Sequence, residues 1–271
     1  MTEEMPLGRA TAYPEQYSPH LLYAIARTDS RAALGLGDEL PFHGVDIWNA
    51  WELTWLDSGG LPQVGTAEIR VPASSPNIIE SKSLKLYLNS FAMTRYASAS
   101  DMAETIEQDL SEAAGTDVAV VLERPAETDG KAITQLPGNS IDAQDLSCDV
   151  YEVDAAVLSA DTDDVVTEAL NSHLLRSLCP VTSQPDNASV LVSYMGPRID
   201  RAGLLRYIVS YRQHQDFHET CVERIFLDIL ERCKPEQLTV YARYQRRGSI
   251  DINPFRSNFE TSPPNSRLWR Q

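Results

Sequence analysis

An internal repeat is the feature of this sequence that most restricts its fold. Shifted by 120 positions, Leu-Lys-Leu-Tyr-Leu-Asn-Ser-Phe at 84–91 lies over Leu-Leu-Arg-Tyr-Ile-Val-Ser-Tyr at 204–211. The same shift places apolar residues over one another further along the chain: Ile106 over Phe226, Leu110 over Leu230, Val118 over Leu238, Val120 over Val240. Because the match needs no gap, we expect a tandem duplication whose two halves fold alike.

Each half is expected to contain two strands, two helices and a further strand. In the first half, apolar alternation and helical spacing predict a hairpin over 51–71, helices over about 83–96 and from about 100, and a strand over 117–122. In the second half they predict strands over 173–178 and 189–194, helices over 204–213 and 219–233, and a strand over 238–244. Residues 1–45 predict an irregular arm with one short helix, and 125–147 a linker. The sequence therefore predicts an α+β protein with domains over 1–145 and 146–271.

The chain is acidic, with a formal net charge of −16, and the acidity is concentrated. Residues 101–170 carry 18 acidic and 2 basic groups, which we interpret as a solvated face plus a linker. This balance disfavours nucleic acid or an anionic membrane as the main partner. No apolar run approaches the roughly 18 residues of a membrane span, and the first residues show no secretory signal. We expect a cytoplasmic protein with a small-molecule ligand.

The cysteines show no CxxC pair or zinc-finger spacing, and we expect them to stay reduced. Cys148, Cys221 and Cys233 are interpreted as structural residues. Cys179 differs because it closes a predicted strand and precedes Pro180, which holds it extended at the start of a loop. Asp186 follows across that loop. A thiolate beside an acid can attack an electrophilic carbon while the acid protonates the neighbouring atom.

His218 and Glu219 begin a predicted helix, where a carboxylate is stabilising whatever its function. The functional interpretation is that Glu219 accepts two N–H bonds from a guanine-like edge while His218 relays a proton. His214, His218 and Cys221 also have a spacing that makes a zinc site conceivable, as the weaker alternative.

Glu-Ser-Lys-Ser at 80–83 opens the first predicted helix. Such a segment is ordinarily a helix cap followed by a basic face. A hydroxyl and a lysine at a helix N-terminus also suit a phosphate, and Arg246-Arg247-Gly248 offers a second contact. No GxGxxG follows a strand, so a Rossmann cofactor site is not indicated.

Several motifs together resemble one family. They are Glu-Ser-Lys-Ser-Leu-Lys at 80–85, Ser-Leu-Cys-Pro-Val-Thr at 177–182 with Gln-Pro-Asp, Phe-His-Glu-Thr-Cys at 217–221, and Arg-Arg-Gly-Ser-Ile-Asp-Ile-Asn-Pro-Phe-Arg at 246–256. Their order resembles the long, two-domain form of the NADPH-dependent 7-cyano-7-deazaguanine reductases (QueF), the nitrile reductases of queuosine biosynthesis, a tRNA modification. The resemblance covers the chain from about residue 20 to its end.

The resemblance implies roles for particular residues. Cys179 would be the nucleophile that forms a covalent thioimide, Asp186 the proton donor and His218 a second participant in proton transfer. The implied substrate-binding positions are Ile79, Glu80, Ser81, His218 and Glu219, and the implied NADPH-binding positions are Ser81, Lys82, Arg247 and Gly248. The family implies no metal, a homodimer, and two tunnelling-fold (T-fold) domains, each a small antiparallel sheet backed by two helices.

At the shift of 120, Cys179 faces Gly59 and Asp186 faces Thr66, so the reactive residues are divided between the halves rather than duplicated. Three other functions stay open on the residues alone. One is a zinc-dependent cyclohydrolase of the same fold, using His214, His218 and Cys221. Another is a noncatalytic purine- or pterin-binding module that keeps Glu219 and does not need Cys179. The third is a thiol hydrolase that needs no nicotinamide.

Overall fold

The computed structural model describes residue 14 and residues 16–125 and 132–271. The chain divides into two compact units, each built from separate stretches of sequence. Unit 1 comprises 1–35, 46–131 and 246–251, and unit 2 comprises 36–45, 132–245 and 252–271. The expected domain boundary at 145/146 stays a prediction.

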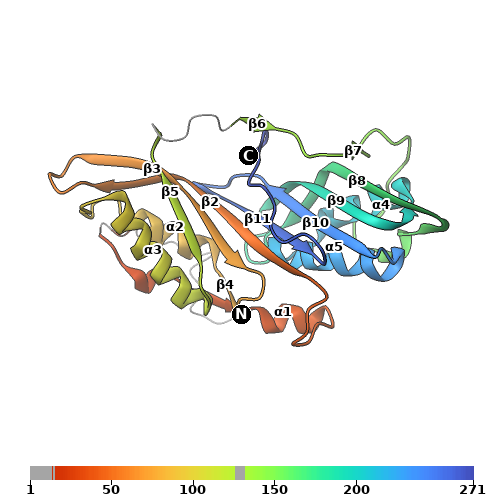
Figure 1. Cartoon of the computed structure of the whole chain (residues 1–271), viewed down its shortest axis with the longest axis horizontal. Coiled ribbons are helices and arrows are strands. Elements are labelled where there is room, and N and C mark those ends of the chain that lie inside the picture. The colour runs from red at the N-terminus through yellow and green to blue at the C-terminus, as the bar shows by residue number, and fades with distance from the viewer. Residues whose placement is uncertain (1–13, 15, 126–131) are drawn as a thin grey trace. The chain divides into compact units, whose positions relative to one another are not determined.

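Unit 1 is an antiparallel sheet with two helices on one of its faces (Figure 1). Its elements are a 3-10 helix η1 (Pro19–Leu21), β1 (Ala24–Ala26), α1 (Arg27–Ala33), β2 (His43–Leu56, in unit 1 from residue 46), β3 (Pro62–Pro72), β4 (Asn77–Ile79), α2 (Ser81–Asn89), α3 (Ala99–Ala114) and β5 (Ala119–Glu123). β5, β3 and β2 lie in this order in the sheet, and β1 pairs with β4.

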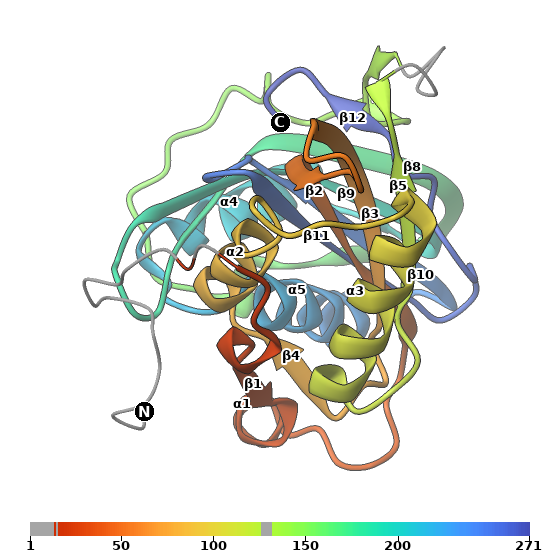
Figure 2. The same ribbon diagram turned by 90° about the vertical axis from the view of Figure 1, so that its left-hand side faces the viewer.

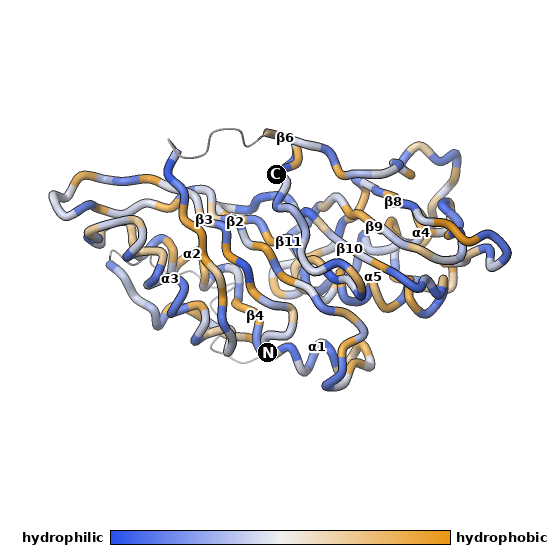
Figure 3. The backbone as a smooth tube through the Cα atoms, viewed as in Figure 1, coloured by the Kyte–Doolittle hydropathy of each residue, from blue (hydrophilic) through white to orange (hydrophobic). Residues whose placement is uncertain are grey.

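Local sequence explains where α3 begins and ends. The Ser98 hydroxyl accepts a hydrogen bond from the Asp101 N–H at 3.1 Å, and Gly115 ends the helix at φ 73°, which glycine adopts without strain. Between them Met102, Ile106 and Leu110 recur at helical spacing and are fully buried. The alternation of apolar and polar positions along α3 is visible in Figure 3. This apolar stripe anchors the helix in the core of unit 1.

Unit 2 has the same plan with longer strands. Its elements are β6 (Ile133–Thr134), β7 (Asn139–Ser140), a 3-10 helix η3 (Ala155–Val157), β8 (Ala160–Leu178), β9 (Pro185–Ile199), α4 (Arg201–Ser210), a 3-10 helix η4 (Tyr211–Gln213), α5 (His218–Cys233), β10 (Gln237–Tyr244), β11 (Ile250–Ser257, in unit 2 from residue 252) and β12 (Arg267–Leu268). The sheet order is β11-β10-β9-β8-β7, with β8 to β11 antiparallel. Helices α4 and α5 lie on one face of this sheet, as Figures 1 and 2 show.

The predicted repeat is confirmed in the helices. α2 and α4 begin 120 positions apart, and the carboxylates of Glu80 and Asp200 each accept hydrogen bonds from two backbone N–H groups of the first turn. The constant shift, however, is wrong, because α3 and α5 begin at 99 and 218, which is 119 positions apart. Counted from these starts, Ile106 matches Ile225 rather than Phe226. The connections between repeated elements therefore do not all keep their lengths.

Several predicted boundaries are also corrected. The first predicted helix ends at Asn89 rather than near 96, and the next residue, Ser90, donates its hydroxyl to the Tyr87 carbonyl at 2.6 Å. The strands predicted over 173–178 and 189–194 extend over β8 and β9, whose added residues include the exposed acidic run at 161–164. β11 was not predicted: Pro254 interrupts its apolar alternation, and every one of its residues is buried. The short helix expected in residues 1–45 is α1, whereas residues 1–13 and 15 of that arm lie outside the described residues.

The α+β class is confirmed, since each unit combines an antiparallel sheet with two helices on one face, the plan expected of a T-fold domain, and unit 1 adds the short helix α1. Among the helices that the structure describes, none has the length and apolar character needed to cross a membrane.

Candidate functional site

Cys179 follows the last residue of β8 and begins the loop that leads to β9. Its backbone N–H donates to the Gln184 carbonyl at 2.9 Å, and its carbonyl accepts from the Ser183 N–H at 3.0 Å. Ser183 adopts a left-handed conformation at φ 55°, which lets this short loop turn back on itself. The Cys179 side chain is buried. The loop therefore holds the thiol in a closed turn.

Asp186 lies next to this turn because β8 and β9 pair in a fixed register. Ser177 is the partner of Asp186 and Leu178 the partner of Pro185, so the carboxyl group starts β9 directly across from the strand that ends at Cys179. Asp186 is 2% exposed. The register thus places Asp186 on β9 opposite Ser177, two residues before Cys179.

His218, the first residue of α5, lies beside the same carboxylate. Its Nε2 is 3.3 Å from Asp186 Oδ2, and both side chains are almost fully buried. The segment before α5 is fixed to the end of β8, because Leu178 donates its N–H to the His214 carbonyl at 2.8 Å and accepts from the Asp216 N–H at 3.2 Å. These backbone bonds keep the start of α5 against the cysteine loop.

Tyr244, at the end of β10, stacks on the His218 ring. The two ring centroids are 3.8 Å apart and the planes differ by 3°. Burial raises the pKa of the Tyr244 phenol far above its usual range, and the neighbouring Ser177 hydroxyl acts in the opposite direction. The ring thus fixes the plane of the imidazole while its hydroxyl stays neutral.

Tyr244 is a site residue that the sequence did not reveal. It lies at the end of the predicted strand over 238–244, but nothing in the sequence indicates that its ring contacts the first residue of the preceding helix, α5. Cys221 lies near the same ring: burial raises the pKa of its thiol, and the neighbouring Ser177 and Tyr244 hydroxyls act against this. Such a thiol stays protonated, in keeping with a structural role.

The structure does not support the zinc alternative. Within the described part of the chain, no group of three His, Cys, Asp or Glu side chains is placed to hold a metal ion. The nitrogen Nε2 of His214 is 3.7 Å from Asp216 Oδ2, that of His218 lies beside Asp186, and the buried Cys221 thiol contacts hydroxyls.

Glu219 occupies the first turn of α5, directly after His218, and is 4% exposed. A carboxylate at this end of a helix is stabilised by the helix dipole. Unit 2 therefore brings Cys179, Asp186, His218 and Glu219 to one region, where β8, β9 and α5 begin or end.

The other predicted residues belong to unit 1. Ile79 ends β4 and is buried, and Glu80 follows it as the N-cap of α2 with 0% exposure. The Glu80 carboxylate accepts from the N–H groups of Lys82 and Ser83, both at 2.8 Å. These two backbone donors are therefore occupied by the cap, so the Ser81 hydroxyl and the Lys82 side chain are the groups of this terminus that the phosphate interpretation uses.

Cationic side chains remain as phosphate donors in unit 1. Ser81 and Lys82 are half-buried in the first turn of α2. Gly248 adopts φ 66°, and a Cβ built on it would lie 3.5 Å from the Lys85 side chain. The turn that carries Arg247 and Gly248 therefore lies against α2, and its composition fits an anionic dinucleotide.

Unit 1 repeats the cysteine loop without the cysteine. Asp57 follows β2 as Cys179 follows β8, and its N–H donates to the Leu61 carbonyl at 3.0 Å, as the Cys179 N–H does to Gln184. Gln63, the second residue of β3, takes the place of Asp186 in β9, and its amide donates to Asp57 at 3.2 Å. Cys179 therefore corresponds to Asp57 and not to Gly59, which the shift of 120 had predicted. Unit 1 thus has no thiol at this position.

Comparisons with known proteins agree with these motifs. A family model described as "Nitrile reductase, 7-cyano-7-deazaguanine-reductase N-term" matches residues 13–122, and one described as "QueF-like protein" matches residues 185–263. The chain is 54% identical over 271 residues to the NADPH-dependent 7-cyano-7-deazaguanine reductase of Paraburkholderia phytofirmans and 53% identical to that of Burkholderia multivorans, with 99% of both chains covered in each case. A similar relative from Bordetella avium is 54% identical over 261 residues, 96% of both chains. The crystal structure of the archaeosine synthase QueF-Like in the apo form is 17% identical with a TM-score of 0.31, covering 36% of this chain and 95% of that one. With full-length relatives at this identity, the chain belongs to the family of NADPH-dependent 7-cyano-7-deazaguanine reductases.

Proposed function

We propose that this chain reduces the nitrile of 7-cyano-7-deazaguanine to an aminomethyl group with two NADPH, in the biosynthesis of queuosine. The overall reaction adds two hydrides and two protons to the carbon–nitrogen bond and gives two NADP⁺. The observation that carries the proposal is that the closed turn of Cys179 joins the two strands of which one starts with Pro185 and Asp186, whose carboxylate pairs with His218. A thiol next to a paired acid and imidazole suits addition to an electrophilic carbon.

Cys179 acts as the nucleophile in this proposal. Its sulfur forms a bond to the nitrile carbon, and the nitrile nitrogen takes a proton from Asp186 or His218, giving a thioimide. Hydride addition at that carbon is followed by cleavage of the carbon–sulfur bond, which releases the thiolate and leaves an imine. The imine then takes the second hydride and a proton. When bound, NADPH supplies both hydrides.

The remaining residues bind the two reactants. Glu219 accepts N–H bonds from the guanine-like edge of the base, with His218, Glu80 and the backbone at Ile79 and Ser81 as further substrate contacts. Ser81, Lys82, Arg247 and Gly248 hold NADPH, for which the positive charges of Lys82 and Arg247 provide support. No metal takes part.

The test is to mix the protein with 7-cyano-7-deazaguanine and NADPH and to follow absorbance at the nicotinamide band. We expect two NADPH consumed per nitrile, and none with Cys179→Ala. Cys148→Ala, which removes a half-buried thiol away from Asp186, is the matched control and should keep full activity. Mass spectrometry should find one substrate adduct per chain, on Cys179. Full turnover by Cys179→Ala would refute the covalent step.

We also propose that the protein works in the cytoplasm as a homodimer and does not bind nucleic acid in this role. Four free thiols suit a reducing compartment, and a net charge of −16 opposes binding to polyanions. The edge strand β5 exposes Val121, with 54% of its surface accessible, and an exposed edge is a common pairing surface. Light scattering on the eluting protein should give twice the mass of the 30.2 kDa chain. A monomer at working concentration would contradict the dimer.

A further inference from the structure

Arg243 on β10 is a buried cation whose partners are all neutral. It is 2% exposed. Nε donates to the Gln271 side-chain oxygen at 3.0 Å, and Nη1 donates to the Tyr241 hydroxyl at 2.6 Å and to Asn265 Oδ1 at 2.8 Å. The guanidinium carbon also lies 5.5 Å from the Tyr241 ring centroid. None of these groups carries a negative charge.

Within the described residues, the other buried arginines each have a carboxylate partner, which Arg243 lacks. Arg256 has Nη2 at 2.9 Å and Nε at 3.1 Å from Glu223, and Arg27 has Nη2 at 2.6 Å from Asp46. A buried charge is costly unless an opposite charge accompanies it. Of the three arginines that are buried in the described part of the chain, Arg243 alone has no carboxylate partner.

A small cavity adjoins the Arg243 side chain. Its volume is about 70 Å³, and its wall is made of two arginines, four other polar residues and one leucine: Arg243, Arg270, Asn187, Ser189, Gln245, Gln271 and Leu268. No Asp or Glu side chain of the described residues lines it. Nη2 of Arg243 donates to no described residue, and is therefore available to a molecule in the cavity.

Arg270 brings a second positive charge to the same cavity. Its Nη2 donates to the carbonyls of His173 and Ala188, at 2.7 and 3.0 Å, and lies 3.3 Å from the Ser189 hydroxyl. These partners are neutral as well. Two guanidinium groups at one cavity repel each other, and an anion between them would remove both the repulsion and the cost of burying Arg243.

We propose that this cavity is a binding site for one small oxyanion of the phosphate class, held by Arg243 and Arg270. A guanidinium presents a planar fork of donors that matches phosphate oxygens, and the Ser189 hydroxyl and the amides of Asn187 and Gln245 can donate in addition. The cavity is far smaller than the roughly 300–1,000 Å³ of a drug-sized ligand pocket. It therefore admits a free anion or the phosphate group of a larger molecule, but not a nucleobase.

The test uses calorimetric titration of the full chain with inorganic phosphate, with ionic strength held constant by chloride. We expect binding that is about tenfold weaker or lost in Arg243→Gln, because the buried donor is removed. Arg198→Gln is the matched control, since it removes the same charge from an exposed arginine paired with Asp164, and it should bind phosphate as the parent does. The readout is anion binding and does not depend on nitrile reduction.

Arg270→Gln tests the same site if Arg243→Gln fails to fold, because Arg270 is exposed and its loss leaves the core intact. It should also weaken phosphate binding. Repeating the titration with saturating NADPH separates two sources of the anion: competition identifies a phosphate of the dinucleotide, and independent binding identifies a free anion. The proposal would be overturned if the parent chain does not bind phosphate. It would also be overturned if Arg243→Gln and Arg270→Gln bind phosphate as tightly as the parent does.

Discussion

The imidazole of His218 owes its orientation to one aromatic ring. Tyr244 covers it at a centroid distance of 3.8 Å, while Asp186 touches only one nitrogen at 3.3 Å. A carboxylate at this distance leaves the ring free to tilt, whereas a parallel ring does not. Tyr244 is therefore a positioning residue for the proton transfers proposed for His218.

Replacing Tyr244 separates the ring from the hydroxyl. Tyr244→Leu should lower kcat by about tenfold or more with a smaller change in KM, because a misplaced imidazole slows proton transfer. It should also shift the pH profile of kcat. Tyr244→Phe keeps the stacked ring and should retain most of the activity. The idea fails if Leu and Phe at this position give the same rate and profile.

Arg256 and Glu223 form a buried ion pair, whose contribution to stability can be measured by changing single residues. Glu223→Gln leaves the guanidinium buried without its counter-charge and should lower the free energy of unfolding by about 3–5 kcal/mol. Arg256→Met combined with Glu223→Gln removes the orphaned charge and should recover part of that loss. Urea denaturation measures both. A cost below about 1 kcal/mol for Glu223→Gln would mean that water reaches the guanidinium.

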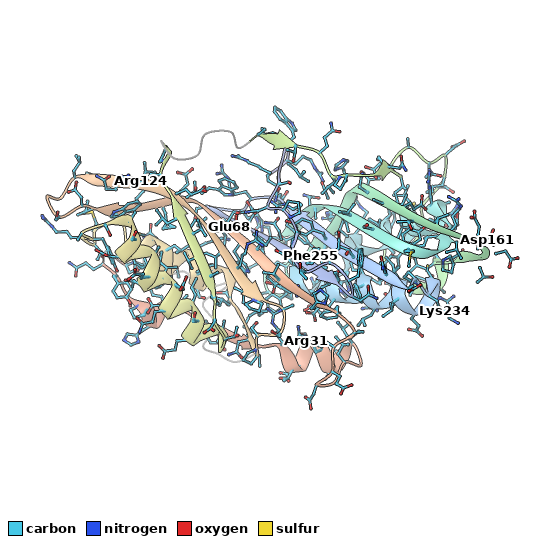
Figure 4. The ribbon with its side chains drawn as sticks, viewed as in Figure 1. Arg31, Glu68, Arg124, Asp161, Lys234 and Phe255 are labelled. Atoms are coloured by element: carbon cyan, nitrogen blue, oxygen red, sulfur yellow. The ribbon has the colours of Figure 1, made fainter. Side chains whose placement is uncertain are left out.

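At the scale of elements, the sequence predicted the helices well because their apolar residues recur at a fixed spacing. The helix predicted over 219–233 begins one residue earlier in the structure, at His218, and ends as predicted at Cys233. The next residue, Lys234 (labelled in Figure 4), adopts a left-handed conformation. Burial on one face alone did not decide which strands were predicted, because β10 was predicted and is buried on both faces. β11, interrupted by Pro254, and the first half of β8, rich in exposed acidic residues, were not predicted.

The candidate site, too, was predicted only in part. Residues that carry chemistry, such as Cys179 and Glu80, stand out by type and by motif, and the repeat predicted that the halves share a fold. A helix cap at 80–83 was among the predictions and is found at Glu80, whereas the sequence could not predict that Tyr244 covers His218. That contact depends on how β10 packs against the helix that precedes it, which the pattern of residue types does not specify.

At Gly203, helix α4 lies very close to η3. Alanine is favoured over glycine in a helix by about 1 kcal/mol. A Cβ at this position, however, would lie 2.4 Å from the Val157 carbonyl oxygen, and η3 would have to move. Gly203→Ala should therefore lower the free energy of unfolding by about 1–3 kcal/mol. The neighbouring change Ala202→Gly measures the helix preference alone and should cost about 1 kcal/mol. A higher free energy of unfolding for Gly203→Ala would show that η3 moves away from the new side chain at little cost.

At the scale of the whole molecule, the duplication supplies two similar units, of which only one carries the nucleophile. Unit 1 keeps the turn after β2, with Asp57 and Gln63 where unit 2 has Cys179 and Asp186. A carboxylate tied to its own turn, as Asp57 is to the N–H groups of Gly59 and Leu61, is a poor nucleophile. One reactive thiol per chain follows, and labelling with a thiol reagent that mimics the substrate should reach one equivalent at Cys179.

Stability at high pH is a property of the whole chain, because its buried phenols and thiols are protonated in the fold. Burial raises the pKa of Cys233 to about 11, and it raises those of Cys221 and Tyr207 further. In the unfolded chain a thiol ionises near pH 8.5. The stabilisation from a raised pKa is complete below that value and is lost as the pH rises through the folded-state pKa.

We therefore expect the free energy of unfolding to fall between about pH 8.5 and 11, with each such group contributing at most about 1.4 kcal/mol per pH unit. Cys233→Ser replaces the ionisable thiol with a hydroxyl of similar size that can still donate to the Ser159 carbonyl. Its unfolding free energy should decline less steeply over this interval than that of the parent chain. Urea denaturation at several pH values measures both slopes, and identical slopes would show that the Cys233 thiol ionises as readily in the fold as in the unfolded chain.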